Sequence, residues 1–431
     1  MLGRSYNYLK QSAIIVGNEL GDIASFHQKS ITTRRLRIVA GLTLGIVLVL
    51  TLILRYCSSL PGYSLLGFDP ALTPPYPPSV SIMGVSWDFS HIIQTALGSD
   101  EWPTTWGADD NVYTGWGDGG GFGGGNMDGR VSLGFARIEG TPPNITGKNV
   151  WGSYPTHAEH AATFCGKPDS MISVGGVLYA WIDSFYNNYP AVNYVQCNPN
   201  PNPPENRLAW SNDLSATWQA SRWKFTQTTG TLSFESFLNF GKDNAGARDS
   251  YIYMYGSRKN DENHFFLARV LPANLKNDPT VPGQSSYQYF TGLNAAGKPT
   301  WSPDSSRAQP VLSDPNGAAS ALEVTYNPGI KRYLAVYPHG PMKAVGKKTQ
   351  MGQLALMDAP EPWGPWTTAA YYDNWGGYGS NGTEPYYISP KWISPDGTIF
   401  WMTWSGGEDL GIFAGDAFHL VKATLTLKAA R

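Results

Sequence analysis

The sequence predicts an all-β fold, because its composition and its pattern of strands agree. Only 15% of the 431 residues are charged and 13% are aromatic, and the chain contains 48 glycines and 32 prolines. Low charge with many aromatic and turn-forming residues is typical of short strands joined by tight turns, and it argues against helical bundles and coiled coils. No alternation of strands with long helices is visible, which argues against a parallel α/β sheet.

The repeated unit is a pair of apolar or aromatic runs that flank a short turn containing Gly, Asp or Asn. A spacing of roughly 60 to 80 residues per unit leaves room for a four-stranded blade and its loops. The sequence therefore predicts a five-bladed β-propeller, with six blades or a β-sandwich as the alternatives. The five pairs lie in residues 102–116, 170–183, 237–257, 321–338 and 387–405.

The first 54 residues predict a membrane anchor. Residues 1–37 are polar and basic, and residues 38–54 form an uncharged apolar run near the lower length limit of a membrane-spanning helix. Arginines just before the run predict a cytoplasmic N-terminus and a translocated C-terminal domain, so the propeller would be extracellular or luminal in a single-pass membrane protein. A cleaved signal peptide is the alternative, but the preceding segment is long and no A-x-A site follows.

A proline-rich stretch, residues 55–80, predicts an extended stalk, and the folded domain is expected to fill residues 81–428. Two N-x-S/T sequons inside it, at Asn144 and Asn381, predict a glycoprotein if the domain is translocated in a glycosylating cell. Three cysteines exclude a disulfide scaffold, but Cys165 and Cys197 could form one bond in an oxidising compartment. The formal net charge of −2 gives no reason to expect a nucleic-acid partner.

The first candidate for chemistry is the stretch from residue 100 to 125, DEWPTTWGADDNVYTGWGDGGGFGGG. Asp100 precedes its first strand and Asp118 follows its second, and an antiparallel hairpin brings these two ends to the same edge. Paired carboxylates are the minimum requirement for acid/base cleavage of a glycosidic bond. We therefore expect Asp100 and Asp118 to be the acid/base pair, whereas Asp109 and Asp110 in the turn are expected to be structural.

The propeller geometry predicts further members of the site. The start of the first strand in each blade and the end of the second open on the same face, and the residues there mix acids, bases and aromatic rings, as in sugar-processing sites. Asp243 is expected to be a third catalytic acid that positions substrate or tunes a pKa. The residues expected to bind substrate are Trp102, Lys167, Asp183, Arg258, His339 and Tyr386.

Neither a cofactor nor a metal is expected. The glycine run 119–125 lacks the Gly-Lys-Ser/Thr ending of a phosphate-binding loop, and no helix pattern follows it. The spacing of His157, Glu159, His160 and Cys165 fits no standard zinc motif.

Several segments together resemble the domain-of-unknown-function family 4185. They are DEWPTTWGADDNVYTGWGDGGGF, VSLGFARIEG, YIYMYGSRKNDENHFFLARV, PEPWGPWTTAAYYDNWGG and SPKWISPDGTIFWMTWSG. The resemblance covers about residues 81–428 and implies a five-bladed propeller related in shape to arabinanase-like glycoside hydrolases. Some members of that family are endo-D-arabinanases of glycoside hydrolase family 183, and the first-blade acids of their pattern match Asp100 and Asp118. The anchor and stalk are not part of the pattern, which leaves the substrate open.

Together these features predict a membrane-anchored glycoside hydrolase that acts on a furanosyl or related polysaccharide or oligosaccharide. A non-catalytic, lectin-like propeller is the alternative, and a structural or protein-binding propeller is a third interpretation. The sequence assigns neither the acid nor the base individually, and it does not give the glycan, the stereochemistry or the oligomeric state.

Overall fold

The computed structural model describes the C-terminal unit of the chain, which begins at Leu72. The predicted membrane span, residues 38–54, lies outside the described residues. Among the described residues no helix is long and apolar enough to cross a membrane. The described ranges are 73–126, 128–152, 162–186, 205–226, 232–258, 261–281, 285–318, 322–339, 353–373, 375–377, 385–405 and 416–429.

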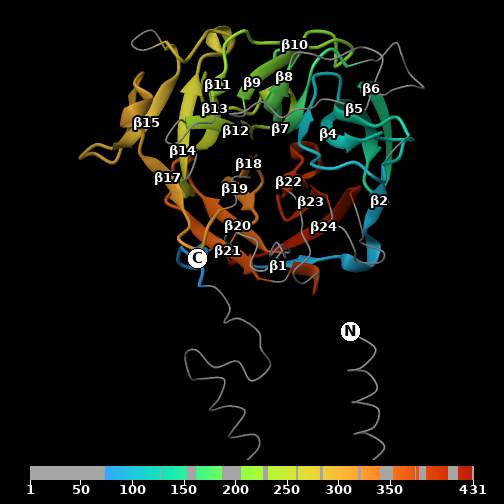
Figure 1. Cartoon of the computed structure of the whole chain (residues 1–431). Helices are drawn as coiled ribbons and strands as arrows, with labels where there is room; N and C mark the ends of the chain where they lie inside the picture. Colours follow the sequence, from blue (N-terminus) through green and yellow to red (C-terminus); the bar gives the residue numbers. More distant parts are fainter. Residues whose placement is uncertain are drawn as a thin grey trace, which may run out of the picture. The chain divides into compact units, whose positions relative to one another are not determined.

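The strands within these ranges form five antiparallel meanders, which we call blades 1 to 5 (Figure 1). Blade 1 contains β3 (Thr104–Trp106), β4 (Val112–Gly119), β5 (Val131–Thr141) and β6 (Asn144–Trp151). Blade 2 contains β7 (Cys165–Val174), β8 (Val177–Tyr186) and β9 (Glu205–Ser211), with β10 (Gln219–Ala220) and β11 (Phe225–Thr226) both paired to β9.

Blade 3 is the largest and has six strands. They are β12 (Leu232–Asn239), β13 (Ile252–Arg258), β14 (Asp261–Val270), β15 (Gln288–Leu293), β16 (Pro299–Ser302) and β17 (Pro310–Ser313). Blade 4 contains β18 (Glu323–Asn327), β19 (Arg332–Tyr337), β20 (Leu354–Ala359) and β21 (Thr367–Tyr372). Blade 5 contains β22 (Tyr387–Ile388), β23 (Ile399–Trp404), β24 (Phe418–Leu427), β1 (Ile82–Trp87) and β2 (Ile93–Thr95).

The blades stand around a common axis, and the first strands of blades 2 to 5, which are β7, β12, β18 and β22, lie toward the centre (Figure 1). Successive inner strands contact one another, from β3 to β7, β12, β18 and β22. Blades 3 and 4 even share a short parallel pairing, in which Leu238 of β12 faces Val324 of β18. The prediction of an all-β fold is confirmed, and a ring of antiparallel meanders is the arrangement of a β-propeller.

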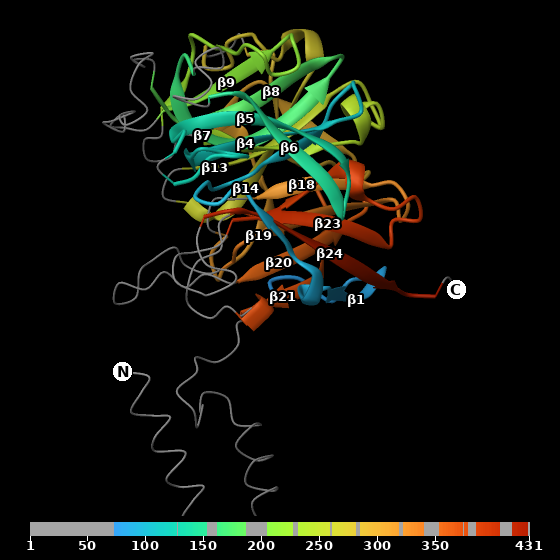
Figure 2. The same ribbon diagram turned by 90° about the vertical axis from the view of Figure 1, so that its right-hand side faces the viewer.

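Blade 5 joins the two ends of the described unit. Its outer strands β1 and β2 come from the N-terminal side, and both pair antiparallel with β24, near the C-terminus. The pairing runs from Ile82 opposite Leu427 to Trp87 opposite Ala423. In Figure 2, β1 lies beside β24, although more than 300 residues separate them in the sequence.

The core is divided among the seams between neighbouring blades. Between blades 5 and 1, for example, Trp102, Trp116 and Phe418 are fully buried and pack with Leu420. Neighbouring blades cover both faces of the inner strands, so the sequences of these strands are nearly continuous runs of apolar and aromatic residues. This explains the low fraction of charged residues in the sequence.

Part of the segment predicted as a stalk contacts the propeller. The amide of Ser79 donates to the carbonyl of Thr368 in β21 at 2.8 Å, and the amide of Thr368 donates to the carbonyl of Pro77 at 2.8 Å. The hydroxyl of Tyr76 accepts from the amide of Ser313 at 2.7 Å. Residues 73–79 are thus hydrogen-bonded to blades 3 and 4, and the remainder of the predicted stalk, 55–72, lies outside the described residues.

Candidate active site

The two acids of the first hairpin lie side by side. Asp100 precedes β3 and forms an isolated antiparallel bridge with Gly117 of β4. The amide of each residue donates to the carbonyl of the other at 3.0 Å. Because Asp118 follows Gly117 directly, the second carboxylate belongs to the same edge of the blade as the first, where the sequence predicts the pair.

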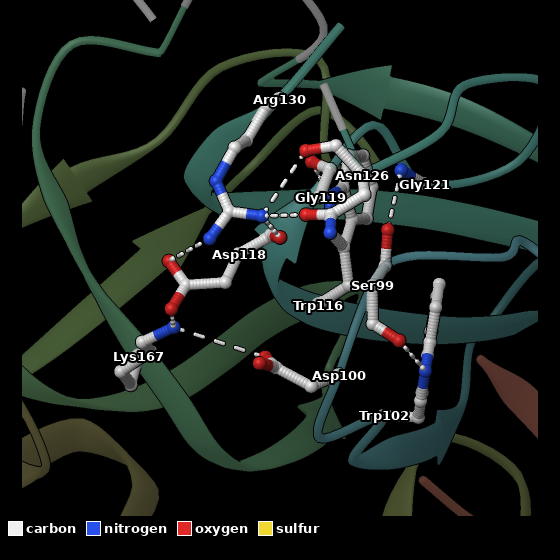
Figure 3. A network of polar contacts seen from close by, with 10 residues as sticks. All are labelled: Ser99, Asp100, Trp102, Trp116, Asp118, Gly119, Gly121, Asn126, Arg130 and Lys167. Atoms are coloured by element: carbon white, nitrogen blue, oxygen red, sulfur yellow. Dashed lines mark hydrogen bonds and ion pairs between the residues drawn. The ribbon is translucent and has the colours of Figure 1, made fainter. Parts of the chain in front are cut away.

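A lysine from the next blade lies between the two carboxylates (Figure 3). The Nζ atom of Lys167, near the start of β7, lies 2.6 Å from Oδ2 of Asp118 and 3.8 Å from Oδ1 of Asp100. These two carboxylate oxygens are therefore at most about 6.4 Å apart, close enough to act on a single glycosidic bond.

Arg130 contacts Asp118 from the other side (Figure 3). Its Nη2 atom lies 3.7 Å from Oδ1 of Asp118. Its Nη1 atom donates to the backbone carbonyl of Asp118 and to the side-chain and backbone oxygens of Asn126. Asp118 thus stands between two cations while its side chain stays 40% exposed.

The backbone around the pair adopts conformations that side chains other than glycine rarely take. The φ angles of Glu101, Trp102 and Asp118 are +74°, +80° and +46°. Such angles carry a conformational cost and cluster at functional sites. At Gly117 a Cβ atom would come within 2.3 Å of Oδ1 of Asp100 and 2.9 Å of Nζ of Lys167. Only a glycine leaves room for this contact.

The two carboxyl groups differ in their surroundings. The side chain of Asp100 is only 11% exposed. Burial raises the pKa of Asp100 to about 6, and the negative charges of Asp118 and Asp416 add to the rise against the opposing effect of Lys167 and Arg130. A carboxyl with this pKa carries a proton under mildly acidic conditions. The side chain of Asp118, in contrast, is partly exposed and lies beside two cations.

Further acids surround the same lysine. Burial opposes the charge of Lys167, but Asp100, Glu101 and Asp118 outweigh it and raise the pKa of Lys167. Burial also raises the pKa of Asp169, two residues along β7, and the nearby charges of Asp183, Glu101 and Glu235 raise it further. Asn206 of β9 donates to Oδ2 of Asp169 at 3.0 Å.

Asp183 was predicted to bind substrate, and the structure brings it to this group. It lies directly opposite Lys167 in the pairing of β7 with β8. Asp100, Asp118, Lys167 and Asp183 therefore come together from two neighbouring blades.

Asp243, predicted as the third catalytic acid, lies elsewhere. It accepts hydrogen bonds from the Ser173 hydroxyl at 2.6 Å and from the amide of Gly176 at 3.0 Å, at the turn between β7 and β8. Ser173 lies six positions after Lys167 along β7, a distance of about 20 Å in a strand. The prediction took the paired runs to begin at residue 237, whereas β12 begins at Leu232, so Asp243 falls in the loop at the opposite end of the hairpin.

The two aromatic residues predicted to bind substrate are in the core. Trp102 is fully buried, donates from Nε1 to the carbonyl of Ser99 at 3.2 Å and lies against Trp116 and Phe418. Tyr386 is also fully buried, and its hydroxyl donates to the carbonyl of Gln353 at 3.1 Å. Neither ring offers a free face to a sugar, because each fills a seam between blades.

Arg258 and His339 lie at the predicted strand ends but contact other parts of their own blades. Arg258 donates to the carbonyl of Ser305 at 3.0 Å and lies over the ring of Phe266. His339 is buried, stacks on Tyr371 at 3.7 Å and contacts the carbonyl of Tyr372 at 2.8 Å. Neither residue contacts the pair of Asp100 and Asp118 in any interaction that the structure records among the described residues.

The prediction missed several charged residues of the site. Glu101 adjoins Asp100 in the sequence, and Arg130 ends the glycine-rich loop, so both carried a local signal. Glu235 and Asp416 belong to blades 3 and 5, and only the closed ring brings them near Asp169 and Asp100. Within the described ranges no group of three His, Cys, Asp or Glu side chains could hold a metal ion.

Comparison with protein families gives one match. The family described as "Domain of unknown function (DUF4185)" matches residues 100–405, a range that contains both acids and all the inner strands. A search of curated proteins found no significant match.

Solved structures with a similar arrangement are distant in sequence. A GH43_1 enzyme from Xanthomonas citri shares 10% identity, with a TM-score of 0.41 over 78% of this chain and 92% of its own. A GH43 β-xylosidase/α-arabinofuranosidase from a compost metagenome shares 13% identity, with a TM-score of 0.41 over 80% and 98%. A protein of unknown function from Dyadobacter fermentans shares 8%, with a TM-score of 0.41 over 80% and 100%. These values are too low to carry an activity over to this chain.

Proposed function

This chain belongs to the DUF4185 family, and we propose that its propeller is a glycoside hydrolase in which Asp100 and Asp118 perform the acid/base chemistry. The observation that carries the proposal is the pair itself. Two carboxylates from one hairpin approach the same lysine at 3.8 and 2.6 Å, one buried and one partly exposed. Glycoside hydrolysis needs one carboxyl group that donates a proton and a second that acts as an anion.

The charges around the pair favour a neutral glycan as substrate. Two cations, Lys167 and Arg130, accompany seven acids in the described part of the site, and five of these remain when Asp100 and Asp169, whose pKa values are raised, are set aside. An excess of carboxylates repels uronic acids and sulfated sugars but accepts hydrogen bonds from hydroxyl groups. The acids are Asp100, Glu101, Asp118, Asp169, Asp183, Glu235 and Asp416.

The resemblance to endo-D-arabinanases makes D-arabinan the first substrate to test. The assay would compare the wild-type protein with Asp100→Asn and Asp118→Asn on D-arabinan and on a panel of plant and microbial glycans, with product analysis. We expect each variant to lose at least about 10³-fold in kcat, since neither proton donation nor anionic assistance survives the change. Asp278→Asn, an exposed turn residue of blade 3, is the matched control.

Unchanged turnover in both variants would remove the pair from the mechanism. Binding to a glycan array without product release, in the wild type, would instead support a lectin. The burial of Trp102 and Tyr386 weighs against the lectin, because the rings predicted to stack on sugar are not accessible.

We also propose that the propeller lies outside the cytoplasm, anchored by residues 38–54. Cys165 is disulfide-bonded, which suits an oxidising compartment. The sequon at Asn144 is exposed on the β5–β6 hairpin, so a glycosylating host should modify it if the domain is translocated. A shift in mass that glycosidase treatment removes and Asn144→Gln abolishes would support this topology, whereas an unmodified Asn144 in such a host would contradict it.

A further inference from the structure

We propose that Lys167 is a positioning residue that divides the work between the two carboxylates: it holds Asp118 as the anion and leaves Asp100 to carry the proton. The inference rests on the proposed hydrolase function and goes beyond it, since the pair alone does not tell which acid does which task.

The geometry of Lys167 is unequal toward its two partners. Its Nζ atom contacts Asp118 at 2.6 Å, the length of a charge-assisted hydrogen bond, but stays 3.8 Å from Asp100, beyond hydrogen-bond distance. Arg130 adds a second cation on Asp118 at 3.7 Å. Among the described residues, Asp118 therefore has one hydrogen-bonded cation and a second cation at 3.7 Å, whereas Asp100 has a single ion pair at 3.8 Å.

The burial of the two carboxyl groups acts in the same direction. Asp118 is 40% exposed and keeps part of its hydration, whereas Asp100 is 11% exposed. Among the residues that the structure describes, none donates a hydrogen bond to the buried Oδ1 atom of Asp100. A buried carboxyl oxygen with no donor favours the protonated form.

The charged groups of the neighbouring elements in the described part of the chain fit this division. The groups that face Asp100 are Lys167 of β7, Asp118 of β4, Arg130 in the segment before β5 and Asp416 in the segment before β24. Lys167 faces Asp100 and Glu101 before β3, Asp118 from β4 and, across the strand pair, Asp183 of β8. The positive charges stand nearer to Asp118, and Asp416 adds a negative charge beside Asp100.

The reaction then proceeds with one proton and one anion in place. Asp100 gives its proton to the glycosidic oxygen, and the electron pair of the breaking carbon–oxygen bond leaves with that oxygen. The Asp118 carboxylate supplies the new electron pair to the anomeric carbon, directly or through a water molecule from which it takes the proton. Lys167 takes part in neither transfer and acts only through the charge state of the two acids.

The first test is the pH dependence of kcat/KM for Lys167→Met and Lys167→Arg. Loss of the positive charge in Lys167→Met should raise the pKa of both carboxyl groups, so both limbs of the profile should move upward by at least half a pH unit. Lys167→Arg keeps the charge and should keep the limbs near their wild-type positions. A profile that keeps its limbs in Lys167→Met, at any level of activity, would overturn the inference.

The second test needs no activity. The carboxyl carbons of Asp100 and Asp118 would be titrated by ¹³C NMR in the wild type, with assignments from Asp100→Asn and Asp118→Asn. We expect Asp118 to ionise at lower pH than Asp100, and Lys167→Met to move both upward; titration of Asp118 above Asp100 in the wild type would refute the inference even if the Met variant does not fold.

The matched control is Lys224→Met in the same blade, whose lysine contacts Glu205 on the outer strands. It should change neither the profile nor the titration. The two tests separate the two proposals. Full turnover in both Asn variants would overturn the hydrolase mechanism and with it the role of Lys167, whereas an active enzyme in which Asp118 titrates above Asp100 would overturn the role of Lys167 alone.

Discussion

At the scale of single residues, the candidate site stores unfavourable interactions. Asp100 is buried beside another carboxylate, and three neighbouring side chains sit on backbone with positive φ. Such unfavourable interactions persist where the surrounding structure imposes them, and they are expected where a protein needs an unusual protonation state. A substitution that removes one of them should therefore raise the stability of the protein and abolish its activity.

The stability of Asp100→Asn should show this cost as a pH dependence. Because the folded protein raises the pKa of Asp100 to about 6, above its ordinary value near 4, protonated Asp100 stabilises the fold at low pH, and that contribution is lost as the pH rises through 6. Asn does not titrate. As the pH rises from 4 to 8, the free energy of unfolding of the variant should therefore increase by about 2–3 kcal/mol relative to that of the wild type.

Urea unfolding of both proteins at pH 4.5 and pH 8 measures this difference. Asp118→Asn is the comparison, since Asp118 is partly exposed and paired with two cations. An Asp100→Asn variant whose stability relative to the wild type is the same at both pH values would mean that folding does not raise the pKa of Asp100.

Gly117→Ala tests how closely the site is packed without replacing any charged residue. The added Cβ would meet Oδ1 of Asp100 at 2.3 Å and Nζ of Lys167 at 2.9 Å, so the carboxylate and the ammonium must separate. We expect kcat to fall by at least about 10²-fold, since displacements on the order of 1 Å in an active site cost that much. Gly84→Ala on β1, where nothing lies within 4 Å, is the control and should leave kcat unchanged.

At the scale of strands, a buried charged group links three strands of blade 4. Arg332 of β19 donates from Nε to Asp358 of β20 at 2.6 Å, and the Thr367 hydroxyl of β21 donates to the other carboxylate oxygen at 2.6 Å. Asp358 is fully buried. Its charge is compensated by one cation and one hydroxyl, each from a neighbouring strand.

Arg332→Leu should destabilise the protein by about 3–5 kcal/mol, because it leaves the Asp358 carboxylate buried without its cation. The free energy of unfolding can be measured with urea at pH 7. The double variant Arg332→Leu/Asp358→Leu should recover much of the loss, since it removes both charges. A loss below about 1 kcal/mol in the single variant would show that the pair is dispensable.

Strand boundaries also explain how far the site could be predicted from the sequence. The rule that the two ends of a hairpin meet at one edge correctly predicts that Asp100 and Asp118 lie together, because their hairpin is short and its turn is easily recognised in the sequence. The same rule misplaced Asp243, because the apolar run of β12 begins five residues before the assumed start, at Leu232. Trp102 had the right position in the sequence, but its positive φ turns it into the core.

At the scale of the whole molecule, the inner strands are tied together by side-chain hydrogen bonds between blades. Such ties depend on contacts between distant segments, so no local sequence pattern predicts them. This is also why Glu235 and Asp416 could not be placed beforehand. The ties are Thr105 to Asn239 at 2.8 Å, Phe237 to Ser170 at 2.8 Å, Thr325 to Ile388 at 3.1 Å and Thr403 to Trp102 at 3.2 Å.

The closure of blade 5 makes the stability of the ring depend on its N-terminal strands. A chain that begins at residue 97 lacks β1 and β2, so one edge of β24 loses its partners along both stretches of pairing. An unpaired central strand exposes apolar surface and invites association with other chains. Compared with a chain that begins at residue 72, we expect the midpoint of thermal unfolding to fall by about 10 °C or more, since a loss of several kcal/mol shifts a domain of this size by that amount.

Differential scanning calorimetry and light scattering at two protein concentrations would test this expectation. The shortened chain should also aggregate more readily, as the exposed edge of β24 predicts. Because Asp100 and the segment before it follow directly on β2, and Asp416 precedes β24, the shortened chain should lose activity along with stability. Equal midpoints for the two chains would mean that the ring closes without β1 and β2, and that the remaining strands of blade 5 are sufficient to hold it.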